Sequence, residues 1–180
     1  GLPKPNMYSG KENGKCRNFS TAEVKETIDK LSAGLMKLGV SGYDMAIENQ
    51  DKIALISKNR PEWLMLDMAC QQIGAAICPI YPTTNVNELE FIFNDATIKH
   101  VFVSGQDILD KVNIIKDNVP SLMNVYSFDE LPDVIFWKTL IADITAADLE
   151  KMEAIKATIK AEHCATIIYT SGTTGKPKGV

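Results

Sequence analysis

Two kinds of apolar pattern alternate along the first three quarters of this chain. Apolar side chains recur every three or four residues between Ser20 and Gly39. Ser20 and Glu23 have capping-box spacing at the start of this segment, and Gly39 ends the pattern. Elsewhere, short continuous apolar runs, typical of strands buried on both faces, lie between segments of helical spacing. The pattern therefore predicts helices alternating with strands.

The alternation continues to Phe128. We expect buried strands over four apolar runs, Ile53–Ile56, Ala75–Ile80, Val101–Val103 and Val125–Phe128. We expect further helices over three segments, Asn59 to about Gly74, Val86–Phe93 and Ile108–Ile115. Apolar strands that alternate with helices indicate an α/β fold, in which a mostly parallel sheet is flanked by helices and the crossovers are right-handed.

The stretch from Leu131 to Lys160 has a different pattern. A short apolar segment, Val134–Trp137, precedes Thr145, which caps a polar helix with one apolar stripe. We interpret this helix as a cover that returns the chain to the sheet before a last strand near Thr166–Thr170. Such a terminal strand would leave a sheet edge uncovered, and a homodimer through that edge would compensate.

Composition and charge narrow the range of functions. Hydrophobic residues make up 45% of the 180 positions, which suffices for one core. A formal net charge of −4 offers no basic surface for nucleic acid. The chain has no apolar run long enough for a membrane span, and Gly1–Pro5 has no signal-like character. We therefore expect a cytoplasmic protein, with peripheral membrane association of a full-length enzyme left open.

The four cysteines, Cys16, Cys70, Cys78 and Cys164, have neither C-x-x-C spacing nor the density of a disulfide scaffold. We expect them to be reduced core residues. A zinc site would have to combine Cys164 and His163 with the distant His100, which no spacing rule supports. Trp63, Met65 and Met68 have helical spacing, so we expect core packing rather than a role in an acyl tunnel.

The most informative segment is Tyr169–Val180, which follows an apolar run. It contains four Ser or Thr hydroxyls, three glycines and two lysines. Glycine lets backbone N–H groups approach an anion, hydroxyls donate to phosphate oxygens, and lysine supplies charge. A Walker A loop is disfavoured because only two residues separate Gly172 from Gly175 and because Pro177 follows Lys176. The order of a dinucleotide-binding loop is absent as well.

The run from Thr170 to Gly179 resembles the phosphate-binding signature of the adenylate-forming superfamily, which includes acyl-CoA ligases, luciferases and adenylation domains. Upstream, Asn59–Trp63 and Gly74–Thr83 are similar to the long-chain fatty acid-CoA ligase branch. The resemblance covers nearly the whole chain and is thin between about Gly105 and Glu162. Gly42–Asp51 is longer than the usual turn, so we expect an insertion or altered loop there.

The resemblance implies which residues bind ATP. Eight residues would hold its β- and γ-phosphates: Thr170, Ser171, Gly172, Thr173, Thr174, Gly175, Lys176 and Lys178. Thr173 would also ligate Mg²⁺, and Lys178 is the better candidate for the compensating charge. Tyr81–Thr84, at the end of an expected strand, is a further candidate border of the site, because ligands gather at the carboxyl ends of parallel strands.

The resemblance also implies an activity and a domain organisation. The complete enzyme would activate a fatty acid with ATP and transfer the acyl group to coenzyme A. We expect an N-terminal part of the large AMP-binding domain: a leading segment and helix (1–50), βα repeats (51–130), a covering segment (131–163), and a strand with the phosphate loop (164–180). The C-terminal domain and catalytic residues would be absent, so this piece alone would be inactive. Activation of an aryl or amino acid, and a non-catalytic nucleotide-binding module, remain alternatives.

Overall fold

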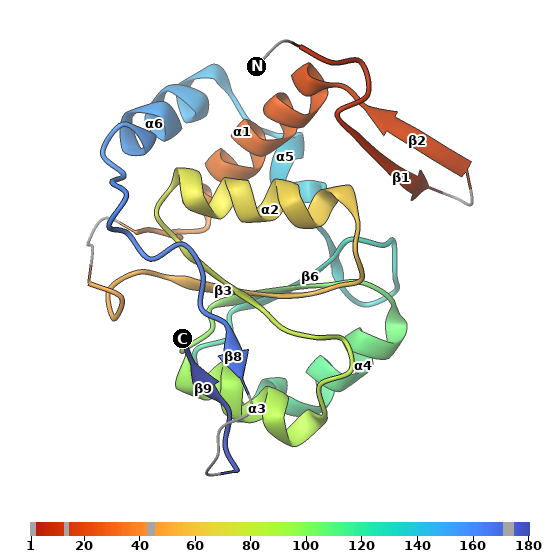
Figure 1. The fold of residues 1–180 in the computed structure, drawn as a ribbon, viewed down its shortest axis with the longest axis vertical. Coiled ribbons are helices and arrows are strands. Elements are labelled where there is room, and N and C mark those ends of the chain that lie inside the picture. Colours follow the sequence, from red (N-terminus) through yellow and green to blue (C-terminus); the bar gives the residue numbers. More distant parts are fainter. Residues whose placement is uncertain (1–2, 13–14, 43–45, 171–174) are drawn as a thin grey trace.

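The computed structural model describes residues 3–12, 15–42, 46–170 and 175–180. A five-stranded sheet lies between two layers of helices (Figure 1). Its strands are β3 (Lys52–Ile56), β4 (Ala76–Pro79), β5 (His100–Val103), β6 (Asn124–Ser127) and β7 (Ile135–Phe136), arranged in the order β4-β3-β5-β6-β7. All neighbouring strands are parallel. The predicted α/β class and parallel sheet are confirmed.

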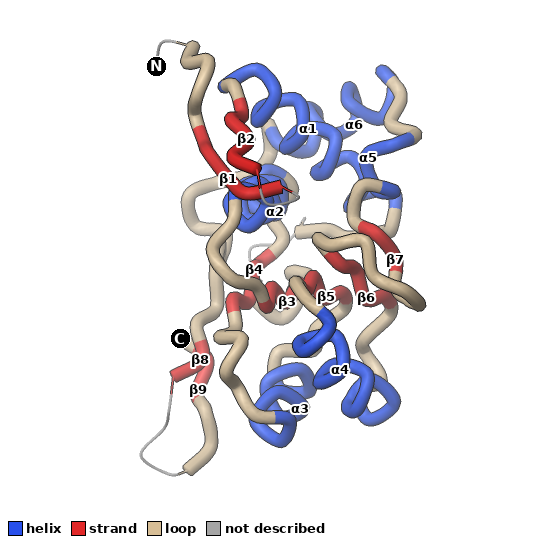
Figure 2. Tube along the Cα trace, turned by 90° about the vertical axis from the view of Figure 1, so that its right-hand side faces the viewer, coloured by secondary structure: helices blue, strands red, loops and turns tan. Residues whose placement is uncertain are grey.

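Helices cover both faces of this sheet, as the view from the side shows (Figure 2). One face carries α1 (Thr21–Lys37), α2 (Pro61–Gln72), α5 (Thr139–Ala142) and α6 (Ala146–Lys156). The other carries α3 (Val86–Asp95) and α4 (Gln106–Ile115), which continues into a 3₁₀ turn, η1 (Lys116–Asn118). Because successive strand residues point to opposite faces, β5 divides its side chains between two cores: Phe102 packs with α1 and α2, and Val101 packs with α3 and α4.

The start and end of α1 agree with the sequence pattern. The Ser20 side chain accepts a hydrogen bond of 3.2 Å from the N–H of Glu23, and Gly39 ends the helix at a φ of 81°. The second half of the expected capping box differs, because the carboxylate of Glu23 accepts a hydrogen bond from Arg17. This bond ties α1 to the segment in front of it.

The sequence pattern did not predict a hairpin at the start of the chain or a strand in the covering segment. Residues Tyr8–Glu12 and Lys15–Phe19 form an antiparallel hairpin, β1 and β2, where only a leading segment was expected. The short apolar segment Val134–Trp137 contributes β7, an edge strand that pairs with β6. In the hairpin, Phe19 is a buried residue at the end of β2. Strand β7 has only two residues, too few to show an alternation of apolar and polar positions in the sequence.

Side-chain burial corrects three expectations. Met65 is buried and Trp63 packs partly buried against the core, but Met68 is 43% exposed, so its assignment to the core was wrong. Cys70 and Cys78 are buried free thiols, and burial raises the pKa of the Cys78 thiol to about 12. Cys16 is exposed and Cys164 is half-buried, so these two are not core residues.

His100 makes folding sensitive to acid. Its side chain is 0% exposed, and its Nε2 has no hydrogen-bond partner among the described residues. Burial, and then the charge of Lys99, lowers its pKa from the ordinary value of 6.5. The unfolded chain therefore binds a proton more readily than the folded chain, so stability is full above the unfolded pKa and is lost as the pH falls toward the folded pKa.

We expect the free energy of unfolding, measured by urea titration, to decrease between about pH 7 and pH 5. The variant His100→Phe should show a flatter profile, because it cannot be protonated in the core. Tyr126→Phe is a suitable control, since its ring lies 6.2 Å from that of His100 and does not titrate in this range. An unchanged slope in His100→Phe would contradict this explanation.

None of the helices in the described part of the chain combines the length and the apolar character that a membrane crossing requires.

Candidate phosphate-binding site

The chain returns to the sheet at the free side of β4. The N–H of Ile77 donates to the carbonyl of Ala165 at 3.1 Å, and the N–H of Ile167 donates to the carbonyl of Ile77 at 2.9 Å. These bonds make a single parallel bridge between Ile77 and Thr166. The expected terminal strand is therefore only one bridge long within the sheet, and the chain then leaves the sheet plane.

After this bridge the glycine- and hydroxyl-rich tail folds back on itself. Tyr169–Thr170 (β8) and Lys178–Gly179 (β9) form an antiparallel pair in which Thr170 lies opposite Lys178. Two further hydrogen bonds, of 2.9 and 3.0 Å, join Ile168 and Val180. We call residues 168–180 the phosphate hairpin. The edge expected to be open at β8 is thus paired with β9, close to the C-terminus in Figure 1.

Half of the predicted site residues lie in the described part of the phosphate hairpin. Thr170, Gly175, Lys176 and Lys178 are exposed on its two arms, and Gly175 has a φ of 85°, which glycine tolerates best. Ser171, Gly172, Thr173 and Thr174 lie outside the described residues. The antiparallel pairing brings Thr170 and Lys178 together across eight positions of sequence, so a hydroxyl donor and an ammonium group share one end of the hairpin.

Helix α3 holds both arms of the hairpin. The Tyr169 hydroxyl donates to Oδ2 of Asp95 at 2.6 Å, and Nζ of Lys176 lies 5.3 Å from the centroid of the Phe91 ring. No sequence motif marks Tyr169, Asp95 or Phe91 as site residues. The i, i+4 spacing of Phe91 and Asp95 shows only that they share a helix face, and nothing in the sequence indicates what this face contacts.

A buried amide fixes the segment that leads to the hairpin. Gln50 is 1% exposed; its Nε2 donates to the carbonyls of Gly74, at 2.6 Å, and Cys164, at 3.1 Å. Its Oε1 accepts from the N–H of Cys164 at 3.1 Å. Gln50 belongs to the stretch Gly42–Asp51, expected to be an altered loop, of which residues 43–45 lie outside the described part. One side chain thus joins this loop, the turn after α2, and the approach to the hairpin.

The second candidate border, Tyr81–Thr84, follows β4 at its carboxyl end. Tyr81 is 76% exposed, and Nζ of Lys111 donates to the carbonyls of Pro82, at 2.8 Å, and Thr84, at 3.1 Å. These bonds fix the turn on α4. A ligand-binding role for Tyr81 stays a prediction.

The Asn59–Trp63 motif connects the start of α2 to the end of β6. It borders a hollow of about 1000 Å³ near the carboxyl ends of β3, β5 and β6. Arg60 bonds to Glu62 at 2.9 Å and to Asp129 at 3.0 Å, and it lies over the Phe128 ring. Asp129 also accepts from the N–H of Gly105 at 2.9 Å. With its charge compensated by two carboxylates, Arg60 joins the start of α2 to the end of β6.

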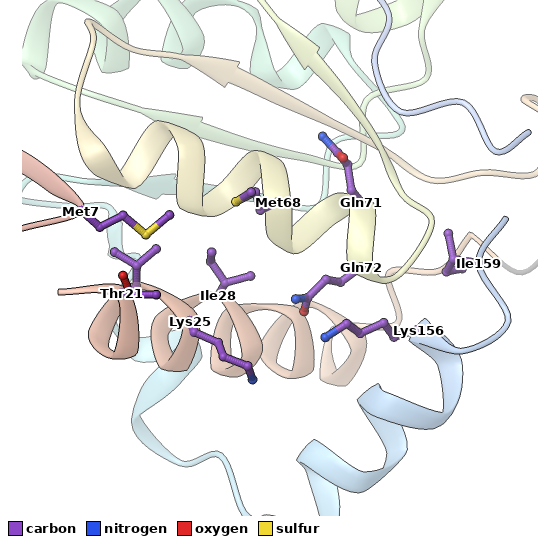
Figure 3. A pocket seen from close by; sticks show the side chains of 10 residues that line it. Met7, Thr21, Lys25, Ile28, Met68, Gln71, Gln72, Lys156 and Ile159 are labelled. Carbon is purple, nitrogen blue, oxygen red and sulfur yellow. The ribbon is translucent and has the colours of Figure 1, made fainter. Parts of the chain in front are cut away.

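A second hollow, of about 570 Å³, lies between α1 and α2 (Figure 3). Met68, Ile28, Lys25 and Lys156 are among the residues that line it. Lys25 bonds to Asp29 at 2.5 Å and Lys156 to Glu153 at 3.1 Å, so both ammonium groups already have carboxylate partners. None of the residues that line this hollow belongs to the described part of the phosphate hairpin. In the residues that the structure describes, His, Cys, Asp and Glu form no group of three or more that could hold a metal ion.

Comparison with known proteins identifies the family. The family model described as AMP-binding enzyme matches residues 4–180. Long-chain-fatty-acid-CoA ligase FadD15 of Mycobacterium bovis is 28% identical over 174 residues, which are 96% of this chain and 28% of that protein. Long-chain-fatty-acid-CoA ligase ACSBG1 of Rattus norvegicus is 30% identical over 156 residues, 84% of this chain and 21% of that protein. The chain thus spans less than a third of the length of these relatives.

A solved structure supports the fold. The crystal structure of the anthranilate CoA ligase AuaEII in complex with anthranoyl-AMP superposes with a TM-score of 0.72 at 20% identity, covering 91% of this chain and 29% of that one. At this identity the likeness concerns the fold alone. The family match over residues 4–180 shows that the chain belongs to the AMP-binding enzyme family, the adenylate-forming enzymes that its glycine- and hydroxyl-rich tail resembles.

Proposed function

We propose that this chain is the N-terminal part of the large AMP-binding domain of a long-chain fatty acid-CoA ligase, and that its phosphate hairpin binds the outer phosphates of ATP. The observation that carries this proposal is the pairing of β8 with β9. It brings Thr170 and Lys178, from the two ends of the signature, into one cross-strand pair on an exposed hairpin.

The hairpin meets a definite chemical need. A carboxylate that attacks the α-phosphorus of ATP leaves negative charge on pyrophosphate, and fixed donors and cations stabilise that charge. Thr170, Ser171, Thr173 and Thr174 donate to the β- and γ-phosphates, and Gly172 and Gly175 let the backbone approach them. Lys176 and Lys178 supply positive charge. Magnesium carried by ATP adds further charge, with Thr173, outside the described residues, as its proposed protein ligand.

The names of the relatives and the motif Asn59–Trp63 favour a long-chain fatty acid as the acid substrate and coenzyme A as the acceptor. An aryl acid is the second candidate, since the structural relative is titled an anthranilate CoA ligase. An amino acid substrate or a non-catalytic nucleotide-binding module is less well supported, because neither relative quoted above carries such a name.

We divide the chain as the sequence suggested: leading segment and helix (1–50), βα repeats (51–130), covering segment (131–163), and strand with phosphate hairpin (164–180). We propose that this piece alone is inactive, because it spans less than a third of the length of the relatives whose names describe the complete ligase. A cytoplasmic location of the ligase stays a prediction. A homodimer stays a prediction, although the strand expected to leave an open edge pairs with β9.

Acid-dependent exchange of pyrophosphate into ATP by the full-length protein tests this function. We expect palmitate to support exchange at least about tenfold faster than anthranilate or an amino acid, because an acyl site of matched length binds more apolar surface. Acyl-CoA should form when coenzyme A is added. Faster exchange with anthranilate would make an aryl acid the substrate. The absence of exchange with every acid would overturn the ligase function.

A further inference from the structure

Both arms of the phosphate hairpin are held by one turn of α3. Tyr169 precedes the predicted phosphate-binding run and donates to Asp95, the last residue of α3. Lys176, on the other arm, lies over the ring of Phe91. Phe91 and Asp95 are four positions apart and therefore lie on the same helix face. The helix that covers the lower side of the sheet in Figure 1 thus also sets the place of the hairpin.

The two contacts differ in kind. The hydrogen bond from Tyr169 to Asp95 is short, with a charged acceptor, and the Tyr169 ring packs against the core formed by α3 and α4. Burial, and then the bond to Asp95, raises the pKa of the Tyr169 hydroxyl well above its usual range, so it keeps its proton and remains a donor. This contact is a permanent anchor for β8.

The contact of Lys176 with Phe91 is weaker and exchangeable. An exposed ammonium group over an aromatic face is held by a modest attraction, whereas a triphosphate offers several charged oxygens. Lys176 is also one of the residues proposed to bind those oxygens. The ring and the phosphates therefore compete for the same ammonium group.

From this arrangement we infer that Asp95 is a positioning residue for ATP binding, because it fixes the hairpin through Tyr169, and that Phe91 competes with the phosphates of ATP for the ammonium group of Lys176. Neither residue touches ATP. This inference rests on the proposed function of the hairpin. It adds that α3 orients the hairpin and that the ring of Phe91 lowers the apparent affinity for ATP.

The anchor is tested by steady-state kinetics of the full-length protein with Tyr169→Phe and Asp95→Asn. Tyr169→Phe should raise the KM for ATP about three- to tenfold, as expected for one hydrogen bond, with kcat changed less than about twofold. Asp95→Asn, which keeps a neutral acceptor, should raise the KM less. The double variant should be no worse than Tyr169→Phe alone, because Tyr169→Phe already removes the bond that Asp95→Asn weakens. Asp117→Asn, an exposed carboxylate of η1, is the matched control and should leave the KM for ATP unchanged.

The exchange is tested with Phe91→Leu, which keeps an apolar side chain and removes the ring. The KM for ATP should fall about two- to threefold, because Lys176 no longer has to leave a cation–π contact. The same substitution in a Lys176→Ala background should have no such effect. A purely structural role for Phe91 predicts instead a higher KM in both backgrounds, and that result would overturn the inference.

The failure of this inference can be told apart from failure of the proposed function. If alanine at Thr173, Thr174 and Lys178 abolishes adenylation while Tyr169→Phe and Asp95→Asn keep the wild-type KM for ATP, the hairpin binds phosphate but α3 does not position it. If the loop substitutions have no effect, the function itself is wrong. Amide hydrogen exchange at Ile168 adds a readout without catalysis, and it should be faster in Tyr169→Phe than in Asp117→Asn.

Discussion

Replacing Thr173, Thr174 and Lys178 together by alanine in the full-length protein should lower the rate of acid-dependent pyrophosphate exchange by about a hundredfold or more. The variant removes two hydroxyl donors and one positive charge from the proposed phosphate site. Stabilising donors of this kind act on charge that develops in the transition state, so kcat should fall as well as the affinity for ATP. Initial rates over a range of ATP concentrations give both quantities.

The matched control carries the same three changes on the covering segment, at Thr139, Thr158 and Lys160, which are all exposed and lie outside the phosphate hairpin. It should exchange pyrophosphate at close to the wild-type rate. Circular dichroism of both triple variants excludes unfolding as the cause of a loss. Normal adenylation by the hairpin variant would remove the basis of the proposed function.

The second large effect concerns stability. Gly42→Ala should lower the free energy of unfolding by about 3 kcal/mol, the upper end of what overpacking costs. A Cβ atom on Gly42 would lie 1.8 Å from the carbonyl oxygen of Gly74, and both positions are backbone, so no side chain can rotate away. The displaced carbonyl is also the one that accepts from Gln50, so the change would weaken this buried hydrogen bond too.

Urea unfolding of the wild type, Gly42→Ala and Ser41→Ala checks this expectation. Ser41 is the neighbouring residue, and its truncation adds no atom to the contact. We expect Ser41→Ala to change stability by less than about 0.5 kcal/mol. A Gly42→Ala protein as stable as the wild type would mean that the two loops separate at little cost, and that Gln50 does not fix the approach to the hairpin as tightly as its three hydrogen bonds indicate.

Several elements could be predicted because their cause is local. Ile53–Ile56 is a run of four apolar residues and becomes the fully buried part of β3. Ser20 accepts from the N–H of Glu23 at the helix start that the sequence indicated. The hydroxyls, glycines and lysines of the tail are adjacent in sequence, so the sequence indicated the chemistry of the site although not its geometry. Met68 was misassigned because helical spacing indicates a common face without saying whether a neighbour covers it.

The rest depended on contacts between distant residues. In the β1–β2 hairpin, Gly10 packs so closely against the ring of Pro61 that a Cβ atom would not fit between them. Strand β7 forms because β6 lies beside it and pairs with it. The expected terminal strand ends after a single bridge, since its next residues pair with β9 instead. Asp95 and Tyr169 lie 74 positions apart, and only the packing of α3 beneath the sheet brings them together.

The sequence by itself determined the α/β class, the order of most strands and helices, the family and the residues proposed to bind phosphate. It could do so because periodicity, capping and the composition of a short loop are properties of neighbouring residues. The tertiary structure alone decided which strands pair, that the tail forms a hairpin, and which helix holds it. These depend on side chains far apart in sequence, whose meeting becomes favourable only once the whole sheet has formed and buried its two faces.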